Sequence, residues 1–340
     1  MFRRAILGLR SLAAATLMLA LAPMGLQPSF AADPPNMEEL LQAIVKVKTF
    51  VPADARSSQN LGTEREGTGI LIDASGLIVT IGYVILEADR VELTARDGRK
   101  VPAEIVGYDY ESGFGLVRAL TKIAAKPMKM GESAEVKVKD RVLAINHAGN
   151  EGMRPAVVVS RREFAGYWEY MLPSAIFTAP PIMDWGGAAL VAPDGRLVGI
   201  GSLIVNDPME AGSASIGPGN MFIPIDDLKP VMADLMTQGR PSSTPRPYLG
   251  LNSEEVRGRV FVTKVSPDTP AAKAGVKPGD IILGVGGQPV STLSEFYKAL
   301  WGTGPAGTDV KLNMLQGVAP AEVTVKSADR YRFLKLNKSY

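Results

Sequence analysis

From Gly67 onward the chain is a succession of short apolar segments, most of them closed by a turn signal. Three of these signals have the Asp- and Gly-containing composition of tight hairpin turns, and they lie at residues 73–76, 96–98 and 193–195. Many short strands at regular spacing are typical of an all-β barrel or of two packed sheets. We therefore expect residues 67–205 to form mainly antiparallel β-structure.

Helical patterns flank this region. Residues 37–51 begin with helical spacing and pass into strand-like alternation. Residues 225–239, "IDDLKPVMADLMTQG", predict a helix that is capped by Asp226 or Asp227 and ended by Gly239. The next stretch, residues 240–247, has the proline and serine content of a linker. A second unit of strand, helix and strand signals follows it.

The first 31 residues have the composition of an export signal. They hold three arginines, an apolar run near residues 12–22 and a small-x-small cleavage pattern. The apolar run is well short of the roughly 20 residues that a membrane span needs, although an uncleaved anchor is the alternative. Without this segment, 34 Lys and Arg remain against 35 Asp and Glu, so no basic surface predicts a nucleic-acid partner. We expect a periplasmic protein with a cleaved signal peptide.

The second unit resembles the PDZ domains that follow exported bacterial proteases. The resemblance rests on residues 248–251 (Tyr-Leu-Gly-Leu), 271–275 (Ala-Ala-Lys-Ala-Gly), 277–282 and a helix over 293–300. It implies that an extended peptide adds to a sheet edge while its terminal carboxylate meets backbone N–H groups. The implied peptide-binding residues are Tyr248, Leu249, Gly250, Leu251, Phe296 and Leu300. For Phe296 and Leu300, a place in the hydrophobic core is the alternative.

The first unit is similar to the HtrA/Deg family of trypsin-like serine proteases. The similarity is carried by "GTGILI", "GYDYESGFGLV", "RVLAIN", "GGAALVAPDGRLVGI" and "NMFIPIDDLKPVMADL". It implies an all-β fold, a trypsin-like double six-stranded β-barrel, followed by an α+β PDZ domain. The implied boundaries are a protease-like domain over 37–239, a linker over 240–247, a PDZ domain over 248–328 and a C-terminal tail over 329–340.

The family's catalytic positions depart from its pattern in this chain. The histidine position falls on Tyr83, the aspartate position on Gly113 and the serine position on Gly186. Asp184 and Trp185 alter the turn that forms the oxyanion hole. A triad needs a hydroxyl, an imidazole that takes its proton and a carboxylate that orients the imidazole. We therefore expect no enzyme but a pseudoprotease, in which Tyr83 and Trp185 fill the former cleft.

Two alternatives stay open. The first is an active periplasmic endopeptidase with a relocated catalytic set, although the only histidine, His147, lies in a loop that does not match the triad histidine. The second is a structural subunit of an envelope assembly. With one histidine and no cysteine, we expect no metal and no cofactor. The expected partners are C-termini or extended segments of exported proteins, an active HtrA paralogue, and further copies of the chain in a homotrimer.

Overall fold

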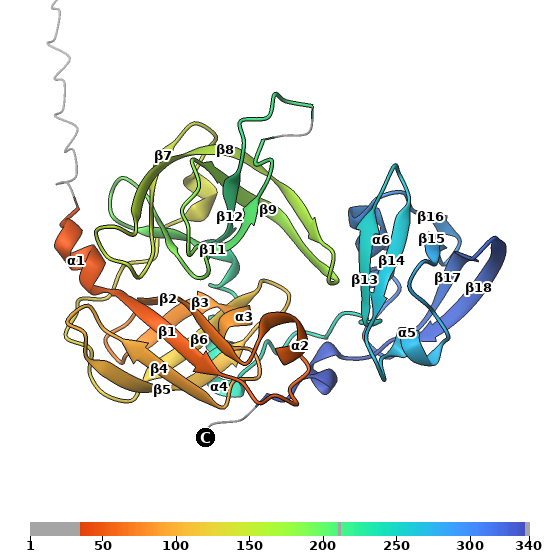
Figure 1. Ribbon diagram of the computed structural model, residues 1–340, viewed down its shortest axis with the longest axis horizontal. Helices are drawn as coiled ribbons and strands as arrows, with labels where there is room; N and C mark the ends of the chain where they lie inside the picture. The colour runs from red at the N-terminus through yellow and green to blue at the C-terminus, as the bar shows by residue number, and fades with distance from the viewer. Residues whose placement is uncertain (1–34, 210–211, 337–340) are drawn as a thin grey trace, which may run out of the picture. The chain divides into compact units, whose positions relative to one another are not determined.

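The computed structural model describes residues 35–209 and 212–336. All of these residues fall in one compact unit. The expected export signal, residues 1–31, lies outside the described residues, as do residues 337–340 of the expected tail. Figure 1 shows the order of the elements along the chain.

The first barrel is closed by six antiparallel strands in the order β1-β2-β3-β6-β5-β4. The strands are β1 (Ile44–Phe50), β2 (Glu64–Leu71), β3 (Leu77–Ile81), β4 (Arg90–Thr94), β5 (Lys100–Tyr108) and β6 (Phe114–Ala119). Three short helices accompany them, namely α1 (Met37–Gln42), α2 (Ser58–Leu61) and α3 (Gly82–Ile85). The predicted hairpin turns at 73–76 and 96–98 join β2 to β3 and β4 to β5, and their glycines have φ of +89° and +82°.

The second barrel repeats this closure with the order β10-β11-β12-β9-β8-β7. Its strands are β7 (Arg141–Ile145), β8 (Met153–Gly166), β9 (Tyr170–Ala179), β10 (Ala189–Val191), β11 (Leu197–Val205) and β12 (Gly219–Pro224). A 3-10 turn, η1 (Ser133–Glu135), precedes them. The hairpin β8–β9 is the longest among residues 35–209 and 212–336, and its turn, residues 167–169, lies at the far end of two extended strands (Figure 1).

The C-terminal unit is a six-stranded antiparallel sheet with two helices. Its main path runs β13-β14-β15-β17-β18, and β16 pairs with β15. The elements are β13 (Leu251–Glu255), β14 (Val260–Val265), α5 (Pro270–Lys273), β15 (Ile281–Val285), β16 (Gln288–Pro289), α6 (Leu293–Trp301), β17 (Asp309–Gln316), β18 (Ala319–Lys326) and η3 (Arg330–Phe333). The predicted helix over 293–300 is confirmed as α6, which Thr292 and Glu295 begin with a reciprocal capping box.

The predicted start of the helix before the linker is wrong. Asp226 and Asp227 lie in a 3-10 turn, η2 (Ile225–Asp227), and the helix α4 (Met232–Gln238) begins only after Pro230. Proline disfavours helical backbone in the residue before it, so the chain cannot continue from the turn into the helix without a break. The predicted end is correct, because Gly239 has the left-handed φ of +74°.

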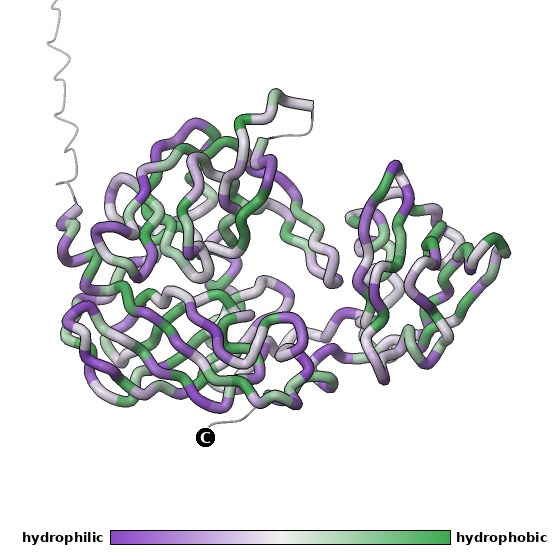
Figure 2. The backbone as a smooth tube through the Cα atoms, viewed as in Figure 1, coloured by the Kyte–Doolittle hydropathy of each residue, from purple (hydrophilic) through white to green (hydrophobic). Residues whose placement is uncertain are grey.

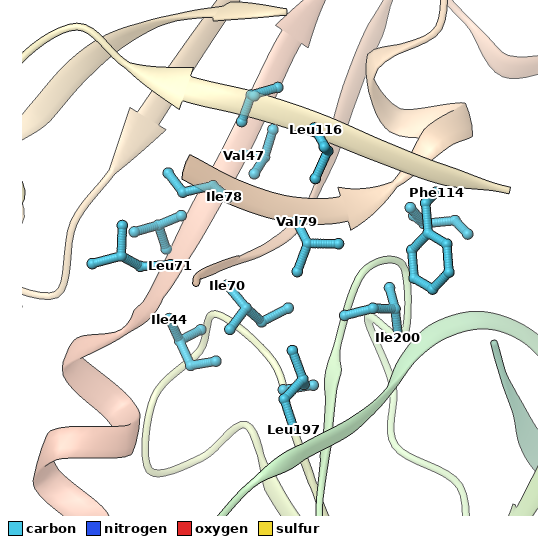
Figure 3. Packing of buried hydrophobic residues seen from close by; sticks show 14 of the residues in the cluster. Ile44, Val47, Ile70, Leu71, Ile78, Val79, Phe114, Leu116, Leu197 and Ile200 are labelled. Atoms are coloured by element: carbon cyan, nitrogen blue, oxygen red, sulfur yellow. The ribbon is translucent and has the colours of Figure 1, made fainter. Parts of the chain in front are cut away.

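Hydrophobic side chains from both barrels form one buried cluster. Figure 3 shows Ile70, Val79 and Phe114 of the first barrel close to Leu197 and Ile200 of the second. Hydrophobic residues recur along the barrel strands, where they alternate with hydrophilic ones in strands such as β1 and β4 (Figure 2). The predicted fold class, two six-stranded barrels followed by an α+β unit, is confirmed.

Candidate functional site

Tyr83 bridges the two barrels. It lies in α3, directly after β3, and its phenol Oη donates a hydrogen bond to the Ser202 carbonyl of β11 at 3.0 Å. The preceding residue, Gly82, donates its N–H to the Gly113 carbonyl at 2.7 Å. A Cβ on Gly82 would come within 2.2 Å of the Tyr108 ring, so glycine is required there. The Tyr83 side chain is therefore held between a tight turn of one barrel and a strand of the other.

Gly186 lies against the same phenol. A Cβ on Gly186 would be 2.8 Å from the Tyr83 Oη, so the phenol occupies the space that a side chain at this position would enter. The Gly186 carbonyl accepts a hydrogen bond from the Thr68 N–H at 2.8 Å, which ties the loop to the first barrel. The structure thus brings together Tyr83 and Gly186, which lie about a hundred residues apart in the sequence.

Gly113, the third position, is in a backbone conformation that disfavours a side chain. Its φ is +89°, and a Cβ there would be 3.0 Å from the Tyr170 Oη and 3.1 Å from the Ile223 Cδ1. Its carbonyl is the one that holds Gly82. The three positions therefore lie in one neighbourhood, and they carry a phenol and two glycines.

The electrostatics of this neighbourhood are set by burial. Burial raises the pKa of Tyr83 well above the usual range, and a hydrogen bond with Trp185 lowers it by less. The phenol is therefore neutral at neutral pH. Asp184 is exposed and has a positive φ of 52°. Trp185 is half-buried and packs on the second-barrel cluster around Leu190 and Phe222.

His147 lies near this junction, beside a threonine that no sequence pattern had indicated as a site residue. Its Nδ1 is 3.1 Å from the Thr68 Oγ1, and its backbone N–H donates to the same oxygen at 3.1 Å. Burial lowers the pKa of His147, helped by Lys46 and opposed by Asp184 and Glu66. Thr68 has no exposed surface. Thr68 lies in the Gly-Thr-Gly of β2, and that pattern does not by itself indicate a contact with a histidine.

The second candidate site is the loop before β13, Tyr248–Leu251. Gly250 has a φ of +88°, and a Cβ there would come within 2.3 to 2.5 Å of the Thr269 side chain. The loop therefore turns tightly over α5, and glycine is the residue that this turn allows. The N–H groups of Leu249, Gly250 and Leu251 converge on one carboxylate, as a carboxylate-binding loop requires.

That carboxylate belongs to the chain itself. Glu169, in the turn of the β8–β9 hairpin, accepts from the Leu249 N–H at 3.0 Å, the Gly250 N–H at 2.6 Å and the Leu251 N–H at 2.7 Å. Glu169 is only 4% exposed, and this burial raises its pKa, although the three N–H groups and Arg330 oppose the rise. Glu169 was not expected from the sequence. Its only signal is an acid within the aromatic run "YWEY".

The rest of the hairpin turn is held by β13 on one side and by α6 on the other, and we call the space between these two elements the PDZ groove. Ser253 of β13 donates its N–H to the Tyr167 carbonyl at 2.8 Å. From α6, the Tyr297 Oη donates to the Gly166 carbonyl at 2.7 Å and accepts from the Glu169 N–H at 3.2 Å. We call residues 166–169 the hairpin tip. The tip therefore lies between β13 and α6, where the resemblance places a peptide ligand.

The expected pocket residues are deeply buried. Leu249, Phe296 and Leu300 have no exposed surface and belong to the hydrophobic core of the C-terminal unit, together with Leu251. Tyr248 is half-buried, and its ring packs on Phe333. Phe296 and Leu300 therefore contribute to the core, the alternative that the sequence left open.

Within residues 35–209 and 212–336, no group of three or more His, Asp or Glu side chains is placed to hold a metal ion. Over the same ranges, no helix is long and apolar enough to cross a membrane.

Comparisons with known proteins agree with this architecture. Residues 67–200 match a trypsin-like peptidase domain, and residues 247–327 match a PDZ domain. The periplasmic pH-dependent serine endoprotease DegQ of Escherichia coli is 28% identical over 322 residues, which cover 86% of this chain and 69% of DegQ. The periplasmic serine endoprotease DegP of the same organism is 30% identical over 262 residues, 74% of this chain and 54% of DegP. The chain thus spans about half the length of DegP.

Among solved structures, the HtrA-type protease AlgW with a decapeptide has a TM-score of 0.52 and 22% identity over 86% of this chain and 97% of that chain. This likeness supports the fold.

One expectation needs correction. The three altered positions led us to expect that the chain is no enzyme, but its relatives are named serine endoproteases, which points to protease activity. The family itself agrees with the sequence resemblance. On its two matched domains, its relatives and its fold, the chain combines a trypsin-like peptidase domain with a PDZ domain and is similar to HtrA-type proteases.

Proposed function

We propose that this HtrA-type chain binds the C-termini or extended segments of exported proteins through its PDZ domain, and acts as an adaptor, scaffold or chaperone. One observation carries the proposal. The loop at Leu249–Leu251 aims three backbone N–H groups at a single carboxylate. A peptide's terminal carboxylate offers the same acceptor, and the edge of β13 offers backbone groups to an extended chain. AlgW, which has the same fold, has been solved with a decapeptide.

In this proposal Tyr83, Gly113 and Gly186 stand at the positions of the family's histidine, aspartate and serine. Their convergence supports the assignment, because Gly82 binds Gly113 and the Tyr83 phenol faces Gly186. Asp184 and Trp185 then form the altered oxyanion turn. Tyr83 serves as a fixed cross-barrel contact through Ser202.

The cellular setting of the proposal is the periplasm, which the names of DegQ and DegP support. Export would use residues 1–31 as a cleaved signal. The domain boundaries are those expected from the sequence, with a linker over 240–247 and a tail over 329–340. A homotrimer, or a complex with an active HtrA paralogue, would present several PDZ grooves to one client.

The binding function is tested with labelled decapeptides that copy the C-termini of exported proteins. Each peptide is paired with a form whose terminal carboxylate is amidated. We expect the free carboxylate to bind and amidation to weaken binding about tenfold or more, because charged hydrogen bonds are lost while the rest of the ligand is unchanged. Equal binding of the two forms would contradict the assignment of the loop.

A second candidate is endopeptidase activity with a relocated catalytic set. It is favoured by the names of the relatives and by the contact of His147 with the Thr68 hydroxyl. An imidazole beside a hydroxyl is the start of an acid–base pair. Thr68 is fully buried, however, so the strand would have to move before a substrate could reach its oxygen.

Casein hydrolysis by stringently purified wild type and His147→Ala tests this candidate. If the candidate is right, turnover is lost in the variant while its thermal unfolding is unchanged. Turnover that is equal in the two proteins would exclude His147 as the base.

A further inference from the structure

We propose that the hairpin tip, residues 166–169, is a built-in ligand of the PDZ groove, and that a C-terminal peptide binds only after the tip has left. This inference rests on the proposed function, since it concerns the same groove. The PDZ groove is then closed by its own chain and opened by competition.

The first support is the carboxylate. Glu169 uses all three N–H groups of the Leu249–Leu251 loop, with donor–acceptor distances of 2.6 to 3.0 Å. These are the distances of strong hydrogen bonds. A second carboxylate cannot use the same three donors while Glu169 accepts from them. The side chain of Glu169 and the terminus of a peptide therefore exclude one another.

The second support is the sheet edge. Beyond the loop, the next part of β13 is engaged by the tip as well, because the Ser253 N–H donates to the Tyr167 carbonyl at 2.8 Å. An added peptide strand would bond this same edge. Tyr167 lies two residues before Glu169, so the tip presents a carboxylate together with a backbone carbonyl that bonds β13 as an added strand would. This combination resembles the end of a bound peptide.

The third support is the opposite wall. Tyr297 of α6 bonds the backbone of the tip twice, at the Gly166 carbonyl and at the Glu169 N–H. Further along the hairpin, Glu163 forms a 2.7 Å ion pair with Lys298 and a hydrogen bond with Ser294, both on α6. The hairpin is thus bound by β13, by the Leu249–Leu251 loop and by α6, which together form the groove.

Arg330 adds a contact from η3, which follows the PDZ sheet. Its Nη1 lies 3.3 Å from both the Trp168 and the Glu169 carbonyls. The tip is therefore held by side chains and backbone groups that lie 80 to 162 residues further along the chain. Hydrogen bonds of this kind can be exchanged for those of a ligand, whereas the packing of Ala165 and Met171 on the core of the C-terminal unit is lost when the hairpin leaves.

The experiment measures the affinity of a fluorescein-labelled decapeptide with a free carboxylate and an aliphatic last residue for the full chain. Glu169→Ala removes the competing carboxylate, and Tyr297→Phe removes the two bonds from α6. Glu151→Ala is the matched control, because Glu151 is an exposed hairpin glutamate at the other end of β8. An amidated form of the peptide reports whether the loop is the site.

We expect Glu169→Ala to bind the peptide about tenfold more tightly than wild type, and Tyr297→Phe several-fold more tightly, because apparent affinity scales with the fraction of open groove. Glu151→Ala should bind as wild type does. Thermal unfolding of each variant identifies one that does not fold, and Tyr297→Phe then carries the test.

The outcomes separate the two proposals. Binding that depends on the carboxylate but is equal in wild type, Glu169→Ala and Tyr297→Phe would overturn the internal ligand and leave the binding function standing. Binding by the variants alone would support both proposals. No binding by any protein would overturn both.

Discussion

The junction around Tyr83 and the groove around Gly250 are both filled, but by different means. At the barrel junction, Tyr83 is part of the first barrel and is fixed by its hydrogen bond to the Ser202 carbonyl of the second barrel. In the PDZ groove, the walls are intact, and the filling comes from a hairpin tip about 80 residues away in sequence. A residue of the wall can be removed only by mutation, whereas a tip held by hydrogen bonds can be displaced. Under the proposed function, the groove is therefore the region where a ligand can act.

The largest expected effect concerns the groove wall itself. Phe296→Ala should lower the free energy of unfolding by about 3–5 kcal/mol, because it leaves a large cavity in the core of the C-terminal unit. Phe296 has no exposed surface. Urea titration of the full chain measures the change. A loss below about 1 kcal/mol would show that Phe296 lines the groove and contributes little to the core.

The next effect concerns the tight turn of the Leu249–Leu251 loop. Gly250→Ala should cost about 2–4 kcal/mol, because it combines an unfavourable φ with a close approach to Thr269. Gly258→Ala is the matched control, since Gly258 also has a positive φ of 70° but a Cβ there meets nothing within 4 Å. If the two variants lose the same stability, packing against Thr269 contributes nothing.

A smaller effect is expected at the barrel junction. Tyr83→Phe removes the bond to the Ser202 carbonyl and should cost about 1–2 kcal/mol, because a buried carbonyl is left without its donor. Tyr167→Phe, at a position that is 52% exposed, should cost much less. Equal stability of wild type and Tyr83→Phe would contradict the role of Tyr83 as a cross-barrel contact.

The smallest effect is a difference in pH dependence between the two regions. The pKa of Glu169 is raised in the folded protein, so the folded state holds this proton more tightly than the unfolded state does. The contribution of the protonated Glu169 carboxyl to the free energy of unfolding is present at acidic pH and is lost as pH rises through the raised pKa. Relative to Glu169→Gln, the wild type should therefore become less stable as pH rises from about 4 to 7.

Tyr83 provides the contrast, because its pKa lies far above this window. The stability difference between wild type and Tyr83→Phe should stay constant over the same pH range. Denaturant titrations at several pH values measure both differences. A constant difference for Glu169→Gln would show that the buried carboxyl keeps its ordinary pKa.

Local patterns predicted much of the fold. Turn residues such as Gly76 and Gly98 fixed the hairpins, and Thr292 marked the start of α6. The helix predicted from Asp226 was wrong at its start because Pro230 interrupts it. In such cases a single residue decides the boundary.

The candidate site was predicted only in part, for a physical reason. Gly250 and its neighbours were identifiable because their glycine and apolar pattern is local. Glu169 was not, because its partners lie 80 to 82 residues further along the chain. Likewise, nothing near Phe296 in sequence distinguishes a groove wall from a core, since burial depends on residues brought in by the whole sheet.

The connection of the hairpin tip to the PDZ groove within one chain has a quantitative consequence. A ligand joined to its receptor through folded structure acts at a high effective concentration, on the order of millimolar even for flexible connections. A free peptide must overcome that concentration before it occupies the groove. Dilute or weakly matching C-termini would then be ignored, and only an abundant or well-matched one would register, so the hairpin sets a threshold for response.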